Sequence, residues 1–137
     1  MKIYTSYFAY LKHLHENNIV PVNIALWPPK WYKGLSYKAL APLYFMMRGN
    51  LTREQYIENY NQCVLSKLNP NQVAERLRQL TSDKDCALMC FEKPGDFCHR
   101  HLVAEWLSKN TTFNVVEYTA PSTPEISKPE PQQLTLF

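Results

Sequence analysis

Residues 85–91, with the sequence DCALMCF, limit the possible folds more than any other segment of this chain. Apolar residues follow one another without interruption from 86 to 91, so a strand here would be hydrophobic on both faces. Such a strand belongs in the centre of a parallel sheet, where helices cover it on both sides. The sequence therefore predicts an α/β fold.

Strands and helices alternate along the rest of the chain, as they do in parallel sheets covered by helices. The apolar patterns predict strands over 2–7, 19–26, 85–91 and 113–118, and helices over 8–16, 36–47, 52–68, 71–80 and 97–109. We expect one three-layer domain over residues 1–118, with a mostly parallel sheet.

Local signals set several helix boundaries. Thr52 and Gln55 form a capping box, and Asn69 precedes a proline at the first position of the next helix. Asp96 is expected to cap the helix over 97–109. Pro42 must kink or split the helix over 36–47.

The loops that leave parallel strands meet at one edge of the sheet, where open α/β sheets bind their ligands. Three segments are expected at this edge: Thr5, Ser6 and Tyr7 at the end of the first strand, residues 27–33 after the second, and residues 92–100 after the third. We predict the ligand site there.

The stretch EKPGDFCHRH, residues 92–101, contains the most reactive side chains of the chain. A glycine turn followed by a helix would present free backbone amides and the positive end of a helix dipole, which together bind anions. We predict Lys93 and Gly95 at the ligand, and Cys98, His99 and Arg100 as the catalytic group. The dipole and the two cationic side chains would favour a Cys98 thiolate. In the alternative, Cys98 only begins the apolar stripe of the helix.

The sequence gives little support for a metal or a cofactor. Cys90, Cys98, His99 and His101 show no paired ligand spacing, and helix neighbours two apart point to different faces. A metal site from these residues is the weaker alternative. The four cysteines are expected to be thiols, because the chain carries no export signal.

Aromatic and basic residues alternate after the second predicted strand. Trp27, Trp31 and Tyr32 offer stacking surfaces beside Lys30 and Lys33. This mixture suits a base or a nucleotide, with stacking contributing about 1–3 kcal/mol per base. The alternative is that the aromatic rings and the prolines simply pack over the edge of the sheet.

Charge is unevenly distributed along the chain. Residues 1–80 hold ten Lys or Arg against four Glu, whereas residues 81–137 hold five against eight acidic residues. This asymmetry is compatible with an anionic partner such as nucleic acid. Neither a signal peptide nor an apolar membrane span is expected, so we predict a cytoplasmic protein without a membrane partner.

Residues 119–137 form a proline-rich segment that is expected to be an extended tail. The segment contains QLTLF, in which Gln133, Leu134, Leu136 and Phe137 resemble the peptide by which bacterial replication and repair proteins bind the DNA polymerase sliding clamp. The resemblance implies the clamp as a partner. In the alternative, these apolar residues fold back onto the chain's own domain.

Three further stretches, KIYTSYF, LWPPKWYKG and CFEKPGDFCHRHLVAEWL, resemble the DUF488 family over roughly residues 1–118. The resemblance implies a Rossmann-like fold and a pocket around Cys98, His99 and Arg100, without a settled activity. Many members carry Asp and Arg at the end of the second strand, where this chain has residues 25–27 with the sequence ALW. A catalytic role of that acidic residue therefore does not transfer to this chain.

Three functional hypotheses follow. The first is a DNA-associated protein of a bacterium or its phage, brought to the sliding clamp by its tail and binding a nucleotide, a phosphate or a flipped base. The second is a non-enzymatic scaffold or inhibitor of the clamp. The third is an enzyme of small molecules unrelated to DNA.

Overall fold

A computed structural model describes residues 1–92 and 97–119 of the chain. Its centre is a five-stranded sheet in the order β3-β2-β4-β1-β5, and every neighbouring pair of strands is parallel. The strands are β1 (Ile3–Tyr7), β2 (Val20–Asn23), β3 (Leu35–Ser36), β4 (Cys86–Cys90) and β5 (Val116–Glu117). The predicted α/β fold is confirmed, and the sheet is parallel throughout.

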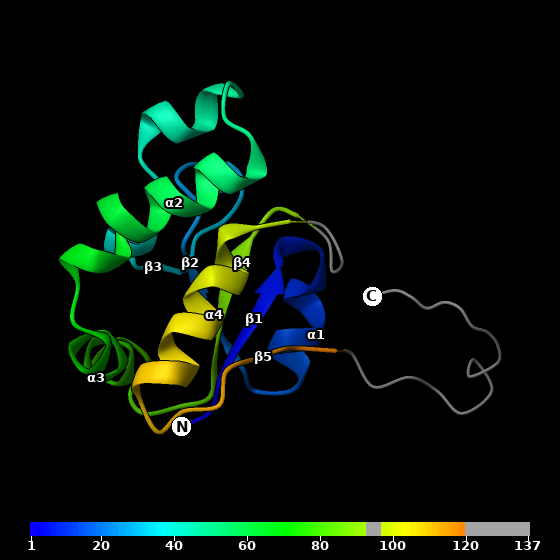
Figure 1. Cartoon of the computed structure of the whole chain (residues 1–137). Coiled ribbons are helices and arrows are strands. Elements are labelled where there is room, and N and C mark those ends of the chain that lie inside the picture. The colour runs from blue at the N-terminus through cyan, green and yellow to red at the C-terminus, as the bar shows by residue number, and fades with distance from the viewer. Residues whose placement is uncertain (93–96, 120–137) are drawn as a thin grey trace, which may run out of the picture.

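Strand β4 occupies the middle of the sheet, between β2 and β1. All of its residues are buried, as the uninterrupted apolar run predicts. Cys90 lies opposite Tyr7 of β1, and Met89 lies opposite Asn23 of β2. The carboxyl ends of these three strands therefore meet at one edge of the sheet, which is the upper edge in Figure 1.

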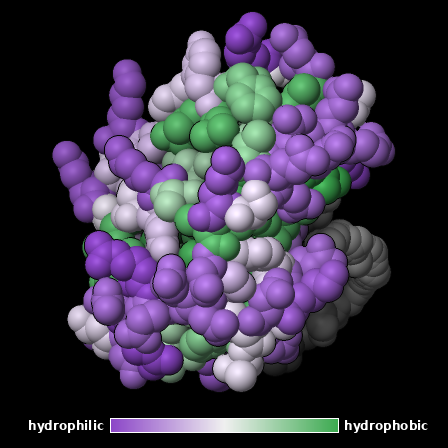
Figure 2. Space-filling view, turned by 60° about the vertical axis from the view of Figure 1, so that its left-hand side comes forward, coloured by the Kyte–Doolittle hydropathy of each residue, from purple (hydrophilic) through white to green (hydrophobic). Residues whose placement is uncertain are grey.

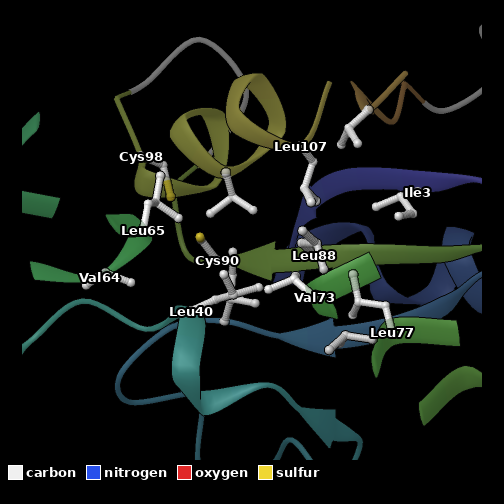
Figure 3. Close-up of a cluster of buried hydrophobic side chains, with 14 of the residues drawn as sticks. Ile3, Leu40, Val64, Leu65, Val73, Leu77, Leu88, Cys90, Cys98 and Leu107 are labelled. Carbon is white, nitrogen blue, oxygen red and sulfur yellow. The ribbon is translucent and has the colours of Figure 1, made fainter. Parts of the chain in front are cut away.

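Helices cover both faces of the sheet, which gives the predicted three layers (Figure 1). The helices are α1 (Leu11–Glu16), α2 (Arg53–Cys63), α3 (Pro70–Thr81) and α4 (His99–Asn110). Leu14 of α1 packs in a cluster with Phe8 and Met89 on one face. On the other face, α2, α3 and α4 build a larger cluster in which Leu77 and Leu107 meet strand β4, as Figure 3 shows.

Two of the predicted helix caps, at Thr52 and Asn69, are present. The Thr52 side chain accepts a hydrogen bond from the Gln55 amide, and the Gln55 side chain accepts one from the Thr52 amide. Asn69 accepts hydrogen bonds from the first amides of α3, with Pro70 at the first helical position. These local signals fix where α2 and α3 begin.

The helix expected over 36–47 is wrong. This segment instead contains β3 and two short 3-10 helices, η2 (Lys38–Leu40) and η3 (Tyr44–Arg48). Pro42 lacks an amide hydrogen and disfavours a helical residue before it, and Ala41 is accordingly extended. The helix expected over 52–68 also ends earlier, at Cys63, and continues as the 3-10 helix η4 (Leu65–Lys67).

The helix expected over 97–109 begins two residues later than predicted. Cys98 is the extended N-cap of α4, with φ −156° and ψ 146°, and its side chain makes no capping hydrogen bond. The predicted cap, Asp96, lies outside the described residues. The extended N-cap turns Cys98 back toward the end of β4.

The segment that carries η2 and η3 forms an apolar cap above the sheet edge. Leu43, Phe45 and Met47 are exposed there, and Figure 2 shows apolar residues gathered at this upper end of the molecule. The buried Tyr60 hydroxyl donates a hydrogen bond to the Leu40 carbonyl and so holds the segment against α2. Among the described residues, no helix is long and apolar enough to cross a membrane.

We predict that Tyr60→Phe lowers the free energy of unfolding by about 1–3 kcal/mol, because the buried Leu40 carbonyl loses its partner. Urea unfolding followed by circular dichroism measures the effect. Tyr44→Phe is the matched control, since the Tyr44 side chain is exposed. Equal stability of the two variants would contradict the assigned role of the hydroxyl.

Candidate functional site

A pocket of about 410 Å³ opens at the carboxyl ends of β2 and β4. One wall comes from the loop after β2 and includes Trp27, and another comes from the end of β4 and includes Phe91. The remaining walls come from η3, the start of α2 and the start of α4, which supply Met46, Met47, Thr52, Arg53, Tyr56 and Phe97. The pocket therefore lies at the edge where the sequence predicts a ligand.

Two cysteines and a histidine line the deepest part of this pocket. Cys90, Cys98 and His99 are only 1%, 3% and 6% exposed. The His99 ring nitrogen Nδ1 lies 3.7 Å from the Cys90 sulfur and 3.8 Å from the Cys98 sulfur. The fold thus brings together two residues of the predicted catalytic group and a cysteine from β4.

The loop after β2 fixes the orientation of His99. Nε2 of the ring lies 2.7 Å from the Ile24 carbonyl oxygen. The buried Asn23 side chain accepts a hydrogen bond from the Ala25 amide and donates one to the Ala25 carbonyl, which closes a tight turn around Ile24. A carbonyl oxygen can only accept, so Nε2 carries the hydrogen, and Nδ1, which lies near both sulfur atoms, has the free lone pair.

Burial governs the ionisation of Cys98. Burial and a hydrogen bond with Cys90 raise the pKa of the Cys98 thiol well above its usual value, while His99 lowers it less. The expected activation by the helix dipole is therefore outweighed, and the thiol is protonated at neutral pH. The depth at which Cys98 is buried depends on the packing of distant segments and cannot be read from the sequence.

Arg100 points away from the pocket, contrary to its predicted place beside a ligand. The fully buried guanidinium donates two hydrogen bonds to the Glu117 carboxylate, at 3.1 and 3.0 Å, and one to the Glu92 carbonyl at 2.6 Å. Thr5 also donates to Glu117. Burial alone would lower the pKa of Arg100, but the hydrogen bonds and charge of Glu117 raise it above its usual value. Arg100 therefore fastens α4 to β5.

Among the described residues that line the pocket, Arg53 supplies the arginine or lysine side chain, and no sequence pattern pointed to it. Its guanidinium lies over the Phe97 ring, 5.1 Å from the centroid, and both residues line the pocket. The N-termini of α2 and α4 reach the pocket as well, at Thr52 and Cys98. The capping box shows where α2 begins, but no local signal shows that this helix end faces β4.

The aromatic segment after β2 divides between two faces. Trp27 lines the pocket and is 54% exposed. Trp31 is 58% exposed, and together with Tyr32 it lies against Phe8 on the face of the sheet that carries α1. Lys30 and Lys33 are exposed and do not line the pocket. The structure thus brings only Trp27 of this segment to the cysteines and the histidine.

The remaining predicted ligand residues are not at the pocket or are not described. Thr5 and Ser6 are buried within β1, where the Ser6 hydroxyl has no hydrogen-bond partner among the described residues. The predictions for Lys93 and Gly95, and for the clamp-binding residues Gln133, Leu134, Leu136 and Phe137, concern residues outside the described part of the chain.

The fold and the site define an α/β protein with an apolar, ligand-sized pocket over a buried cysteine-histidine cluster. The chain belongs to the DUF488-N3a family, described as the active DUF488-N3 subclade, whose model matches residues 12–111. The match includes Cys90, Cys98 and His99. Comparison with curated proteins and with solved structures gave no match.

We predict that Glu117→Ala lowers the free energy of unfolding by about 3–5 kcal/mol, because it leaves the Arg100 guanidinium buried without a counter-charge. Chemical denaturation of both proteins measures the difference. Glu105→Ala, at an exposed position of α4, is the control and should change stability by less than about 0.5 kcal/mol. A small effect of Glu117→Ala would show that Arg100 finds another partner.

Proposed function

We propose that this chain is a DNA-associated protein whose pocket binds a nucleobase or nucleotide. The observation that carries the proposal is the combination of an exposed indole, Trp27, with the Arg53 cation and two helix N-termini around one pocket. Flat aromatic rings and positive charge are the features by which proteins hold the base and the phosphate of a nucleotide.

The size and the lining of the pocket agree with this ligand class. A volume of about 410 Å³ lies within the usual range of small-molecule sites, roughly 300–1,000 Å³. Trp27 lines the pocket and is 54% exposed, so part of its ring is available to a base, and its contact with Tyr44 is edge to face at a centroid distance of 5.7 Å. Tyr56 and Phe97 supply further aromatic surface to the pocket.

We assign the phosphate to Arg53 and to amides at the N-termini of α2 and α4 other than those of Thr52 and Gln55, which the capping box already engages. Arg53 is exposed at the pocket, whereas the charge of Arg100 is already compensated by Glu117. A base that stacks on Trp27 would meet Cys98 and His99 at the floor, which are therefore the groups in position to act on it. Arg100 contributes indirectly, by holding the first turn of α4 in place.

The association with DNA rests on the tail sequence. Gln133, Leu134, Leu136 and Phe137 resemble the clamp-binding peptide, in which large apolar side chains enter a pocket of the partner and a glutamine fixes the orientation. Short peptides of this kind bind weakly. A flexible tether compensates for this, because a peptide bound to the clamp raises the local concentration of the attached domain at the DNA. We therefore propose a cytoplasmic protein delivered to replicating or repaired DNA by the sliding clamp.

We predict that Trp27→Ala weakens nucleotide binding at least about fivefold, because a stacked base loses roughly 1–3 kcal/mol. Isothermal titration of the full chain with a set of nucleoside monophosphates and short single-stranded DNA measures the affinity. Trp31→Ala is the matched control, since Trp31 is similarly exposed but lies outside the pocket. If no probe binds to the unaltered protein, the nucleotide proposal is wrong.

We predict that the full chain binds a bacterial sliding clamp and that removal of residues 133–137 abolishes this binding. Surface plasmon resonance with an immobilised clamp measures it. Gln133→Ala should weaken binding, whereas Gln132→Ala, one position outside the motif, should not. Clamp binding without any nucleotide binding would favour the non-enzymatic scaffold or inhibitor. Nucleotide binding without clamp binding would favour an enzyme of small molecules.

A further inference from the structure

Three side chains that bind soft metal ions meet at the floor of the pocket. Cys90 ends β4, Cys98 is the N-cap of α4 and His99 is its first residue. One possible ligand atom from each residue lies within 4.8 Å of the others. Figure 3 shows the sulfur atoms of Cys90 and Cys98 on the same side of the core, where α4 begins. Cys90 and Cys98 do not have the short sequence spacing of paired zinc ligands. They come together because the N-terminus of α4 packs against the end of β4.

His99 has the tautomer of a metal ligand. Its Nε2 donates to the Ile24 carbonyl, so Nδ1 keeps its lone pair, and this nitrogen lies within 3.8 Å of both sulfur atoms. Histidines that bind metals almost always donate their other ring nitrogen hydrogen to a carbonyl or a carboxylate, which fixes the tautomer. The Asn23 turn that holds Ile24 therefore serves as the outer support of the site.

The distances agree with tetrahedral coordination. With metal-sulfur and metal-nitrogen bonds of about 2.3 and 2.0 Å, sulfur and nitrogen ligands of one zinc ion lie about 3.6 Å apart. Nδ1 lies 3.7 Å from Cys90 Sγ and 3.8 Å from Cys98 Sγ. Cys90 Sγ is also 3.7 Å from Nε2, so it lies beside the ring, and a side-chain rotation is needed to bring it onto the metal.

Hydrogen bonding alone satisfies these groups less well. Nδ1 has one lone pair and accepts a hydrogen from only one thiol, so the other thiol must donate to a sulfur atom, which is a weak acceptor. A divalent ion engages the lone pair and both sulfur atoms at once. When it binds, the two thiols release two protons, so the buried site gains no net charge.

We propose that Cys90 Sγ, Cys98 Sγ and His99 Nδ1 bind a divalent, borderline-soft metal ion of the zinc class. Two thiolates and an imidazole favour such an ion over magnesium or calcium, which require oxygen ligands. All three residues line the 410 Å³ pocket, so the fourth coordination position faces the pocket and is open to water or to a bound ligand. Three protein ligands with one open position are typical of catalytic zinc. The proposal goes beyond nucleotide binding, and it does not depend on it.

The test is a titration of the full chain with Co²⁺, after removal of metals with a chelator and in the presence of a phosphine reductant. We expect one equivalent of Co²⁺ to bind, with the intense visible bands of tetrahedral cobalt, a near-ultraviolet thiolate-to-cobalt band, and displacement of both by Zn²⁺. Absence of the thiolate band from the unaltered protein would overturn the proposal without any variant.

Variants locate the site. Cys90→Ala and Cys98→Ser should each weaken Co²⁺ binding more than about 100-fold, since even the outer partners of metal ligands contribute about 10–100-fold. Cys63→Ser is the matched control, because Cys63 is a half-buried thiol at the end of α2, and it should bind as the unaltered protein does. Circular dichroism confirms that each variant is folded. A thiolate band that disappears in Cys63→Ser, or persists in both folded pocket variants, would also overturn the proposal.

Discussion

The burial of strand β4 on both faces is the constraint on which the rest of the structure depends. Every residue of this strand is buried, so its backbone groups must pair with β1 and β2, and its side chains must be covered by helices on each side. Polar function is thereby confined to the edge where the strand ends. Cys90 is the last residue of β4, and its thiol lies at that edge of the sheet, where it forms part of the floor of the pocket.

The different environments of Arg100 and Arg53 give these two arginines different roles. Arg100 enters the interior beside the sheet, where its charge is tolerable only because Glu117 and the Glu92 carbonyl compensate it. Arg53 lies at the surface, where its guanidinium is exposed to solvent and makes a cation–π contact with the Phe97 ring. An internal arginine orders the helix that carries Cys98 and His99, and a surface arginine remains available to a ligand.

Sequence alone predicted the features whose causes are local. The apolar run of β4, the capping box at Thr52 and the Asn69 cap each depend on a few neighbouring residues, and all three are confirmed. Features that depend on contacts between distant segments could not be predicted from the sequence. These are the pairing of Arg100 with Glu117, the position of Arg53 at the pocket, and the burial that raises the Cys98 pKa. Pro42 was recognised as a helix breaker, but the strand β3 nearby depends on its pairing with β2 and carries no local signal.

The position of β5 gives the molecule a mechanical property. Within the described part of the chain, this edge strand pairs only with β1, and the Tyr118 amide donates a hydrogen bond to the Thr5 carbonyl just before the described residues end. Any force applied to the chain after residue 119 therefore enters the domain through Glu117 and Tyr118. Glu117 passes that force to Arg100, one residue from His99. The Arg100–Glu117 ion pair thus joins the last described strand, from which the tail continues, directly to the first turn of α4.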